Sequence, residues 1–239
     1  MKTRRYCFIV NPIAGTKSKV DVVKQIDLLF NSYNYVIRYT KRAGHATTLA
    51  QEALGKFDVV VAVGGDGTVN EVSKGLLHSD CTLGIVPMGS GNGLARHLGV
   101  PMNLGKALRF IESADSYLID TCSLNGESYN ITAGVGFESD IAYLFAQQKG
   151  RGLFNYVKSI LQSVFSYTSK QYDFELDGEK YSRKAFTVSV ANANQYGNNT
   201  YINPIADLRD GVFEVCLIKP FGILGVFSVL AKMFTKKLD

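Results

Sequence analysis

The chain has 239 residues, of which 46% are hydrophobic and 20% charged, and a formal net charge of +5. This is ordinary globular composition, which excludes a disordered protein, and the length suits two domains. The modest positive charge fits a nucleotide or an anionic lipid surface, and it fits a protein with no particular anionic partner equally well. No dense stripe of Lys and Arg with interleaved aromatics is present, so we expect no nucleic-acid partner.

Cysteine spacing and hydropathy indicate the cellular compartment of the protein. The sequence has four cysteines: Cys7, Cys81, Cys122 and Cys216. They show no metal-ligand or C-x-x-C spacing, which favours reduced thiols in a reducing compartment. The longest apolar stretch, 221–234, contains Lys232 and falls short of the roughly 20 residues that span a bilayer. We therefore expect a cytoplasmic protein that is at most peripheral at the inner membrane face.

The first half of the chain alternates strand and helix. Apolar runs predict strands over 6–10, 35–40, 59–63 and 83–86, and helical spacing predicts helices over 20–30, 46–53, 69–77 and up to residue 96. Repeated units of this kind favour a doubly wound parallel sheet. Right-handed crossovers would bring the turns after the first, third and fourth strands to one edge, where such sheets bind ligands.

The rhythm changes near residue 115. Asn-Gly at 125–126 and Asp-Gly at 177–178 predict two hairpins. A helical stretch over about 140–165, a strand over 213–218 and a helix from about 221 complete this half. We predict an α/β nucleotide-binding domain over residues 1–118 and a β-rich, mainly antiparallel domain over 119–239.

Three glycine-bearing turns are expected at the shared edge of the sheet. They are Asn11-Pro12-Ile13-Ala14-Gly15, Gly64-Gly65-Asp66-Gly67-Thr68-Val69-Asn70 and Gly89-Ser90-Gly91-Asn92. Glycines leave a bare backbone that can approach a bulky anion closely. Thr68 and Glu71 have the spacing of a capping box, with Thr68 as the N-cap of the next helix. The positive end of that helix dipole also favours a phosphate.

Asp66 stands among these glycines. An aspartate can brace a turn by bonding to its own backbone, but a carboxylate flanked by glycines is better suited to hold Mg²⁺ or accept a proton. The sequence contains neither a Walker loop nor a complete dinucleotide-binding pattern, which disfavours both of those classes.

Two other polar residues near the predicted edge have competing interpretations. His45 stands at the start of a predicted helix, where packing or capping is favoured over a role as catalytic base. Arg96 could meet a phosphate or a lipid head group, although exposed basic residues usually form a solvated face.

The ordered motifs resemble the diacylglycerol kinase catalytic domain, whose superfamily includes bacterial soluble lipid kinases, sphingosine kinases and ceramide kinases. The set comprises the three turns, Thr40 followed by Gly44-His45-Ala46, and Pro87 before Gly89. The resemblance covers nearly the whole chain, including 130–137 and 207–213, and implies an NAD kinase/phosphofructokinase-like nucleotide-binding domain. The motif at 64–68 also occurs in NAD kinases, but 89–92 fits lipid kinases better.

The resemblance implies a role for each matching residue. ATP contacts would come from Asn11, Pro12, Gly15, Thr40, Gly64, Gly65, Asp66, Gly67, Thr68, Val69, Asn70, Gly89, Ser90, Gly91 and Asn92. Asp66 and Asp120 would act in catalysis, although Asp120 also fits a carboxylate buried at a hinge. A structural Mg²⁺ would be bound by the Asp210 carboxylate and the carbonyls of Asp207 and Val212, and a plain turn explains this loop equally well.

The implied activity is an ATP- and Mg²⁺-dependent lipid kinase that phosphorylates a lipid hydroxyl, such as that of diacylglycerol, at a membrane surface. The family's catalytic glutamate lies on a strand beyond the helix from residue 221, and this sequence stops before it. Asp177-Gly178-Glu179 has the same triplet in an earlier hairpin. We expect a C-terminally truncated kinase. The alternatives are a catalytically deficient nucleotide-binding or regulatory homologue and, less favoured, an NAD kinase. The acceptor lipid and the oligomeric state stay open, with a homodimer as one candidate.

Overall fold

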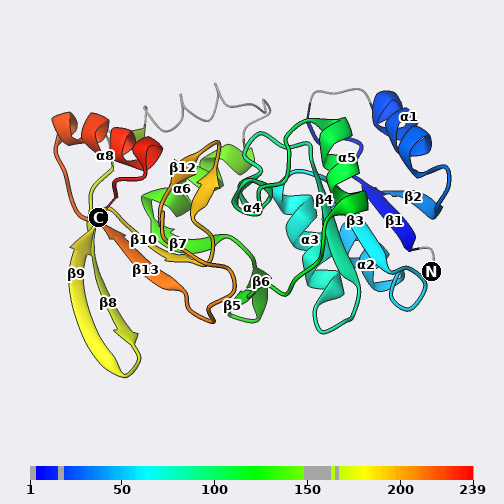
Figure 1. Cartoon of the computed structure of the whole chain (residues 1–239). Helices are drawn as coiled ribbons and strands as arrows, with labels where there is room; N and C mark the ends of the chain where they lie inside the picture. The colour runs from blue at the N-terminus through cyan, green and yellow to red at the C-terminus, as the bar shows by residue number, and fades with distance from the viewer. Residues whose placement is uncertain (1–3, 16–18, 148–162, 165–166, 239) are drawn as a thin grey trace. The chain divides into compact units, whose positions relative to one another are not determined.

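The chain forms two compact units in the computed structural model (Figure 1). The structure describes residues 4–15, 19–147, 163–164 and 167–238. Unit 1 comprises residues 1–130 and 197–199, and unit 2 comprises residues 131–196 and 200–239. The domain ranges expected from the sequence stay a prediction.

Unit 1 is built on a four-stranded parallel sheet, which confirms the α/β fold class. Its strands are β1 (Arg5–Val10), β2 (Asn34–Tyr39), β3 (Val59–Gly64) and β4 (Thr82–Pro87), in the order β2-β1-β3-β4. The apolar run in β3 is buried throughout, as expected for a parallel strand covered on both faces. All four strands therefore end at one edge of the sheet.

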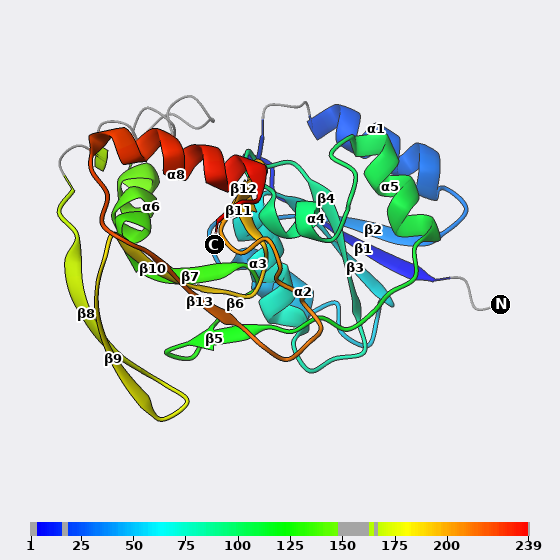
Figure 2. The ribbon, with the colours of Figure 1, turned by 60° about the vertical axis from the view of Figure 1, so that its left-hand side comes forward.

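Helices cover both faces of this sheet (Figure 2). They are α1 (Lys19–Phe30), α2 (His45–Gln51), α3 (Asp66–Leu76), α4 (Gly93–His97) and α5 (Leu104–Ser113). α1 packs beside α5, and α2 packs beside α3. Alternate residues of β1 serve the two layers: Tyr6 and Phe8 join the core cluster of α1 and α5, whereas Cys7 and Ile9 are buried toward the other face.

The start of α3 corrects one prediction. The helix begins at Asp66, three residues earlier than expected, and its N-cap is Gly65, which makes no side-chain cap. Thr68 lies inside the first turn, and the Glu71 carboxylate instead accepts a hydrogen bond from the Ala46 amide at 3.0 Å. The predicted capping box is therefore wrong, because Glu71 serves the start of the neighbouring helix α2.

The expected elements do not include α5. This helix is capped at Asn103, whose side chain accepts a hydrogen bond from the Lys106 amide at 3.2 Å. Leu104, Ala107 and Leu108 are buried, at the i, i+3, i+4 spacing of an amphipathic helix. The β5–β6 hairpin (Cys122–Leu124 and Glu127–Tyr129) then completes the main segment of unit 1.

Unit 2 contains the predicted antiparallel sheet, formed by β7 (Thr132–Gly136), β10 (Thr187–Ala191) and β13 (Glu214–Ile218) in the order β13-β10-β7. The other elements are α6 (Phe137–Gln147), the β8–β9 hairpin (Lys170–Leu176 and Glu179–Ala185), β11 (Gln195–Gly197), β12 (Thr200–Tyr201) and α8 (Ile223–Thr235). Of the helical stretch expected over about 140–165, residues 148–162 and 165 lie outside the described residues.

Both predicted hairpin turns are confirmed. Asn125 and Gly126 have φ values of 52° and 82°, and Asp177 and Gly178 have φ values of 50° and 84°. Positive φ at both central residues is the mark of a type I′ turn, whose twist matches that of paired strands. Asp177-Gly178-Glu179 therefore belongs to the β8–β9 turn, as expected.

None of the helices in the described residues combines the length and apolarity required to cross a membrane. The longest apolar stretch of the sequence forms α8, which has 13 residues.

Candidate active site at the carboxyl edge of the parallel sheet

The structure brings the three predicted glycine turns into backbone contact at the carboxyl edge of the sheet. A Cβ added to Gly15 would lie 2.1 Å from the Met88 carbonyl oxygen. A Cβ added to Gly89 would lie 2.6 Å from Gly65 Cα. Real Cβ atoms do not tolerate such distances, so the close approach of the turns requires glycine at both positions.

Hydrogen bonds connect the first two turns. The Asn11 amide nitrogen donates to the Val63 carbonyl at 3.0 Å, and the side-chain Nδ2 of Asn11 donates to Thr68 Oγ1 at 3.0 Å. Met88 N donates to the Gly64 carbonyl at 2.8 Å and so brings the third turn into the same array. The edge is thus fixed by the backbone rather than by long flexible side chains.

The Asp66 carboxylate is held by the third turn. Its Oδ2 accepts a hydrogen bond from Asn92 N and its Oδ1 accepts one from Gly93 N, both at 2.7 Å. Burial raises the pKa of Asp66, and the hydrogen bonds from Asn92 and Gly93 oppose that rise. Asp66 therefore joins the first residue of α3 to the residues that begin α4. The carboxylate therefore braces a second turn.

Asn92 determines the shape of the third turn. It adopts a left-handed conformation (φ 54°) and is 8% exposed. Its Oδ1 accepts a hydrogen bond from Gly89 N at 2.9 Å, and its Nδ2 donates to the Gly89 carbonyl at 2.8 Å. The Asn92 amide is thus directed into the turn, whereas Ser90 at the tip is exposed.

A short segment distant in sequence completes this edge. Residues Gly197, Asn198 and Asn199 have φ values of 121°, 52° and 60°. Asn198 N donates to the Gly91 carbonyl at 3.1 Å. Glycine and asparagine at these positions indicate a turn in the sequence, but no local pattern shows that the turn meets Gly91.

Several predicted ATP-contact residues have structural partners. The Asn70 side chain donates to the Ser128 carbonyl at 3.2 Å and accepts from Asn130 Nδ2 at 3.1 Å. Asn130, which is 4% exposed, also accepts from Ser73 Oγ at 3.1 Å. Asn70 therefore ties α3 to the β5–β6 hairpin, a function that the motif alone does not reveal.

The remaining edge residues differ in exposure. Thr40 is buried directly after β2, and its amide donates to the Val10 carbonyl at 3.0 Å. Val69 is a core residue, whereas Pro12 and Gly67 are exposed. A Cβ added to Gly67 would meet no atom within 4 Å, so this backbone faces open space.

His45 has the structural role expected from its position. Its Nδ1 accepts a hydrogen bond from the Lys41 amide at 3.1 Å, which closes the turn preceding α2. Gly44, in a left-handed conformation with φ 77°, is the N-cap of that helix. The ring nitrogen therefore supports the helix start.

Asp120 and the predicted Mg²⁺ loop lie apart from this edge in the sequence, and their roles stay predictions. Asp120 is half-buried in the extended segment between α5 and β5 of unit 1. In unit 2, Asp210 Oδ1 accepts from Val212 N at 3.0 Å and Asp207 Oδ1 accepts from Arg209 N at 3.1 Å. Within the described ranges, no group of three or more His, Cys, Asp or Glu side chains could hold a metal ion.

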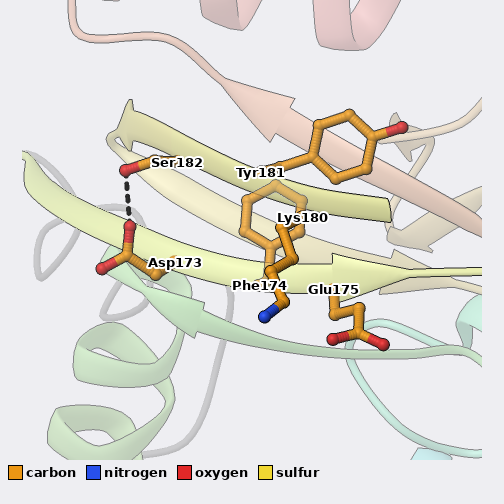
Figure 3. A pocket seen from close by; sticks show the side chains of 6 residues that line it. All are labelled: Asp173, Phe174, Glu175, Lys180, Tyr181 and Ser182. Atoms are coloured by element: carbon orange, nitrogen blue, oxygen red, sulfur yellow. Dashed lines mark hydrogen bonds between the residues drawn. The ribbon is translucent and has the colours of Figure 1, made fainter. Parts of the chain in front are cut away.

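A separate depression of about 450 Å³ lies on the β8–β9 hairpin of unit 2 (Figure 3). It is lined by Asp173, Phe174, Glu175, Lys180, Tyr181 and Ser182. The Phe174 and Tyr181 rings stack with centroids 5.6 Å apart, and Ser182 Oγ donates to Asp173. It contains none of the predicted site residues.

The edge suits the phosphates of a nucleotide with Mg²⁺. Mg²⁺ is commonly held by one or two carboxylates together with substrate phosphates and water, and Asp66 supplies one carboxylate. Its two oxygens accept hydrogen bonds from the third turn, which keep the carboxylate at this edge. The open backbone at Gly67 leaves room for a bulky anion beside it.

Both parts of the chain match models of known protein families. Residues 5–124 match the family model of the diacylglycerol kinase catalytic domain, and residues 132–237 match that of the YegS C-terminal NAD kinase beta sandwich-like domain. The diacylglycerol kinase of Bacillus subtilis (strain 168) is 30% identical over 224 residues, which cover 90% of this chain and 74% of that protein.

Two further comparisons agree. The lipid kinase YegS of Escherichia coli (strain K12) is 30% identical over 188 residues, which cover 75% of this chain and 62% of that protein. A crystal structure of a diacylglycerol kinase from Bacillus anthracis str. Sterne superimposes with a TM-score of 0.75 at 26% identity, covering 97% of this chain and 77% of that one. The chain therefore belongs to the family defined by the diacylglycerol kinase catalytic domain.

Proposed function

We propose that the protein is an ATP-dependent lipid kinase that transfers the γ-phosphate to a lipid hydroxyl, such as that of diacylglycerol. The observation that carries this proposal is the contact of three glycine turns around Asp66 at the carboxyl edge of a parallel sheet. Such edges are the usual ligand sites of open α/β sheets. The names of the relatives support a lipid as the acceptor.

Phosphoryl transfer requires little covalent chemistry from the protein. A bond forms between the acceptor oxygen and the γ-phosphorus, the bond from that phosphorus to the β,γ-bridging oxygen breaks, and the hydroxyl proton leaves to a base. Positioning and charge stabilisation provide most of the catalysis. The bare backbone at Gly67 and the exposed Ser90 hydroxyl offer donors for phosphate oxygens, and the N-terminus of α3 adds a favourable dipole.

Asp66 would hold the metal and fix the third turn at the same time. Both of its oxygens already accept backbone hydrogen bonds, which keep the carboxylate at one position in the edge. Mg²⁺ bound there with ATP would neutralise charge on the β- and γ-phosphates. Asp120 is proposed as a second carboxylate of the site, and the 207–212 loop as a separate structural Mg²⁺ site.

Nucleotide binding without phosphate transfer is a second candidate function. The observation in its favour is the double hydrogen bonding of Asp66, which also suits a purely structural carboxylate. Under this alternative, the glycine turns bind MgATP and the protein regulates a partner.

A transfer assay separates the two candidates. Purified protein is incubated with ATP labelled at the γ-phosphate and with vesicles containing diacylglycerol, ceramide or sphingosine, and MgATP binding is measured by calorimetry in parallel. We expect labelled lipid, with diacylglycerol as the favoured acceptor. MgATP binding without labelled product on any acceptor would support the second candidate, and the absence of MgATP binding would contradict both.

A further inference from the structure

The Gly197-Asn198-Asn199 segment has an unusual backbone. All three residues have positive φ, a region that non-glycine residues seldom occupy in succession. Backbone conformations of this kind persist where the surrounding structure determines them, and they are concentrated at ligand and active sites. The sequence motifs for nucleotide binding do not include this segment.

The segment contacts the third glycine turn directly. A Cβ added to Gly197 would lie 2.7 Å from Gly91 Cα, and an isolated bridge pairs Gly197 with Asn92. Asn198 N donates to the Gly91 carbonyl at 3.1 Å. The left-handed backbone is therefore the conformation that brings residue 199 to the edge containing Asp66.

The side chain that residue 199 reaches is Arg96. Arg96 Nε donates to the Gly91 carbonyl at 3.0 Å, and its Nη1 donates to Asn199 Oδ1 at 3.2 Å. Two hydrogen bonds thus fix the guanidinium plane beside the glycine turn. The ion pairs of the described residues involve Arg5, Arg38, Lys74 and Arg209, so no carboxylate in that part of the chain neutralises Arg96.

A fixed guanidinium without a carboxylate partner is suited to a bound anion, because its fork of N–H donors matches the oxygens of a phosphate. We propose that Asn199 is a positioning residue that orients Arg96 toward a phosphate group of the nucleotide bound at the 89–92 turn. This inference rests on the proposed function. It assigns a role to a segment more than a hundred residues away from the turn that it supports.

Three variants test the inference. Asn199→Gly keeps a residue that accepts positive φ but removes the acceptor for Arg96. Asn198→Gly is the matched control, because it makes the same backbone change at φ 52° and leaves Asn199 in place. Arg96→Gln removes the charge. The affinity for MgATP is measured by calorimetry for each single variant and for the Asn199→Gly/Arg96→Gln double variant, with thermal melting to verify folding.

We expect Arg96→Gln to weaken MgATP binding about tenfold and Asn199→Gly about threefold, in line with hydrogen bonds to a charged group. Asn198→Gly should bind as the wild type does. In the Arg96→Gln background, Asn199→Gly should have no further effect, because its role depends on the guanidinium.

Wild-type affinity in Asn199→Gly or Arg96→Gln, or additive effects in the double variant, would overturn the positioning role while leaving the proposed function intact. Equal losses in Asn198→Gly and Asn199→Gly would show a purely structural turn and would also overturn it. If Asn199→Gly does not fold, wild-type affinity in Arg96→Gln would still overturn the inference, because the proposed role of Asn199 depends on the guanidinium. Wild-type protein that binds no MgATP would instead contradict the proposed function and the inference together.

Discussion

The parallel sheet of unit 1 and the antiparallel sheet of unit 2 differ in where their polar groups lie. In unit 1, the β3 strand is apolar and buried along its whole length, and the polar residues of the candidate site, such as Asn11 and Asp66, follow the strand ends. In unit 2, the central strand β10 carries Thr187 and Ser189, which are both buried within the sheet. The candidate site of the parallel sheet is thus formed largely by the backbone of the turns at one edge, whereas the antiparallel sheet encloses polar side chains in its interior.

The enclosed group of unit 2 is centred on Glu138, at the start of α6. Ser189 Oγ and Tyr196 OH both donate to its carboxylate, and the two hydroxyls lie 2.8 Å apart. A Cβ on Gly134 would collide with the carboxylate at 2.0 Å, so glycine makes room for it. Burial raises the pKa of Glu138, and the hydrogen bonds from Ser189 and Tyr196 oppose the rise. This cluster satisfies its own polar atoms, unlike the open edge of unit 1.

The largest expected effect comes from the carboxylate of that open edge. Asp66→Asn should lower the rate of phosphate transfer roughly a hundred- to thousandfold, the range expected when a key electrostatic group is lost. In the amide, an NH2 donor replaces one of the two oxygens that accept hydrogen bonds from Asn92 and Gly93. Steady-state kinetics measure the loss, with Asp80→Asn as a control at an exposed position. A near-normal rate would remove Asp66 from the mechanism.

Two glycines of the edge should respond differently to alanine. Gly89→Ala places a methyl group 2.6 Å from Gly65 Cα and should destabilise the fold by about 1–3 kcal/mol. Gly67→Ala meets open space and should preserve the melting temperature, yet lower MgATP affinity about tenfold if phosphates rest against this backbone. Denaturant unfolding and calorimetry measure both quantities. Full affinity in Gly67→Ala would contradict a phosphate site there.

The enclosed carboxyl of unit 2 should affect stability through pH and leave nucleotide binding unchanged. A carboxyl with a raised pKa holds its proton more tightly in the folded chain than in the unfolded chain. The contribution of Glu138 is therefore fully present below its ordinary pKa of 4.5 and is lost as the pH rises through the raised value. Relative to Glu138→Gln, the wild type should become less stable across this range.

Denaturant unfolding of both proteins at several pH values measures that difference. Glu175→Gln is the matched control, because Glu175 is exposed on β8. A difference between wild type and Glu138→Gln that stays constant with pH, or that changes equally in Glu175→Gln, would contradict the expected titration of Glu138.

The smallest effect is expected at the 207–212 loop. If Mg²⁺ binds there, saturating Mg²⁺ should raise the melting temperature of the wild type by about 2–4 °C for each kcal/mol of linkage. Asp210→Ala should abolish the shift. Asp207→Ala should retain it, because only the carbonyl of residue 207 is proposed as a ligand. If Asp210→Ala and Asp207→Ala both keep the Mg²⁺-induced shift in melting temperature, the result would favour a plain turn at this loop.

Patterns along the chain predict the strands and most of the helices of unit 1, because buried parallel strands and glycine turns leave strong local signals. The capping box fails because the Glu71 carboxylate instead accepts a hydrogen bond from the amide of Ala46 in α2, a tertiary contact that the spacing of Thr68 and Glu71 does not reveal. α5 is not among the expected elements, although its amphipathic spacing and its N-cap Asn103 are both present in the sequence. Local propensity thus identifies elements but not the contacts of their ends.

In the candidate site, too, the sequence predicts the elements but not the contacts between them. The three glycine turns follow from strand ends and topology. Three contacts do not: Asp66 with the amides of Asn92 and Gly93, Asn70 with the β5–β6 hairpin, and Asn199 with Arg96. Each depends on residues brought together only by the tertiary fold, and no spacing in the sequence encodes it.

Hydrogen exchange with and without MgATP tests the central claim most directly, because it reports on backbone amides and requires no substitution. We predict that MgATP slows exchange at residues 64–70 and 89–93 and leaves the β8–β9 hairpin of unit 2 unchanged. No change at the two glycine turns, or protection confined to the β8–β9 hairpin, would contradict a triphosphate site at the carboxyl edge of the parallel sheet.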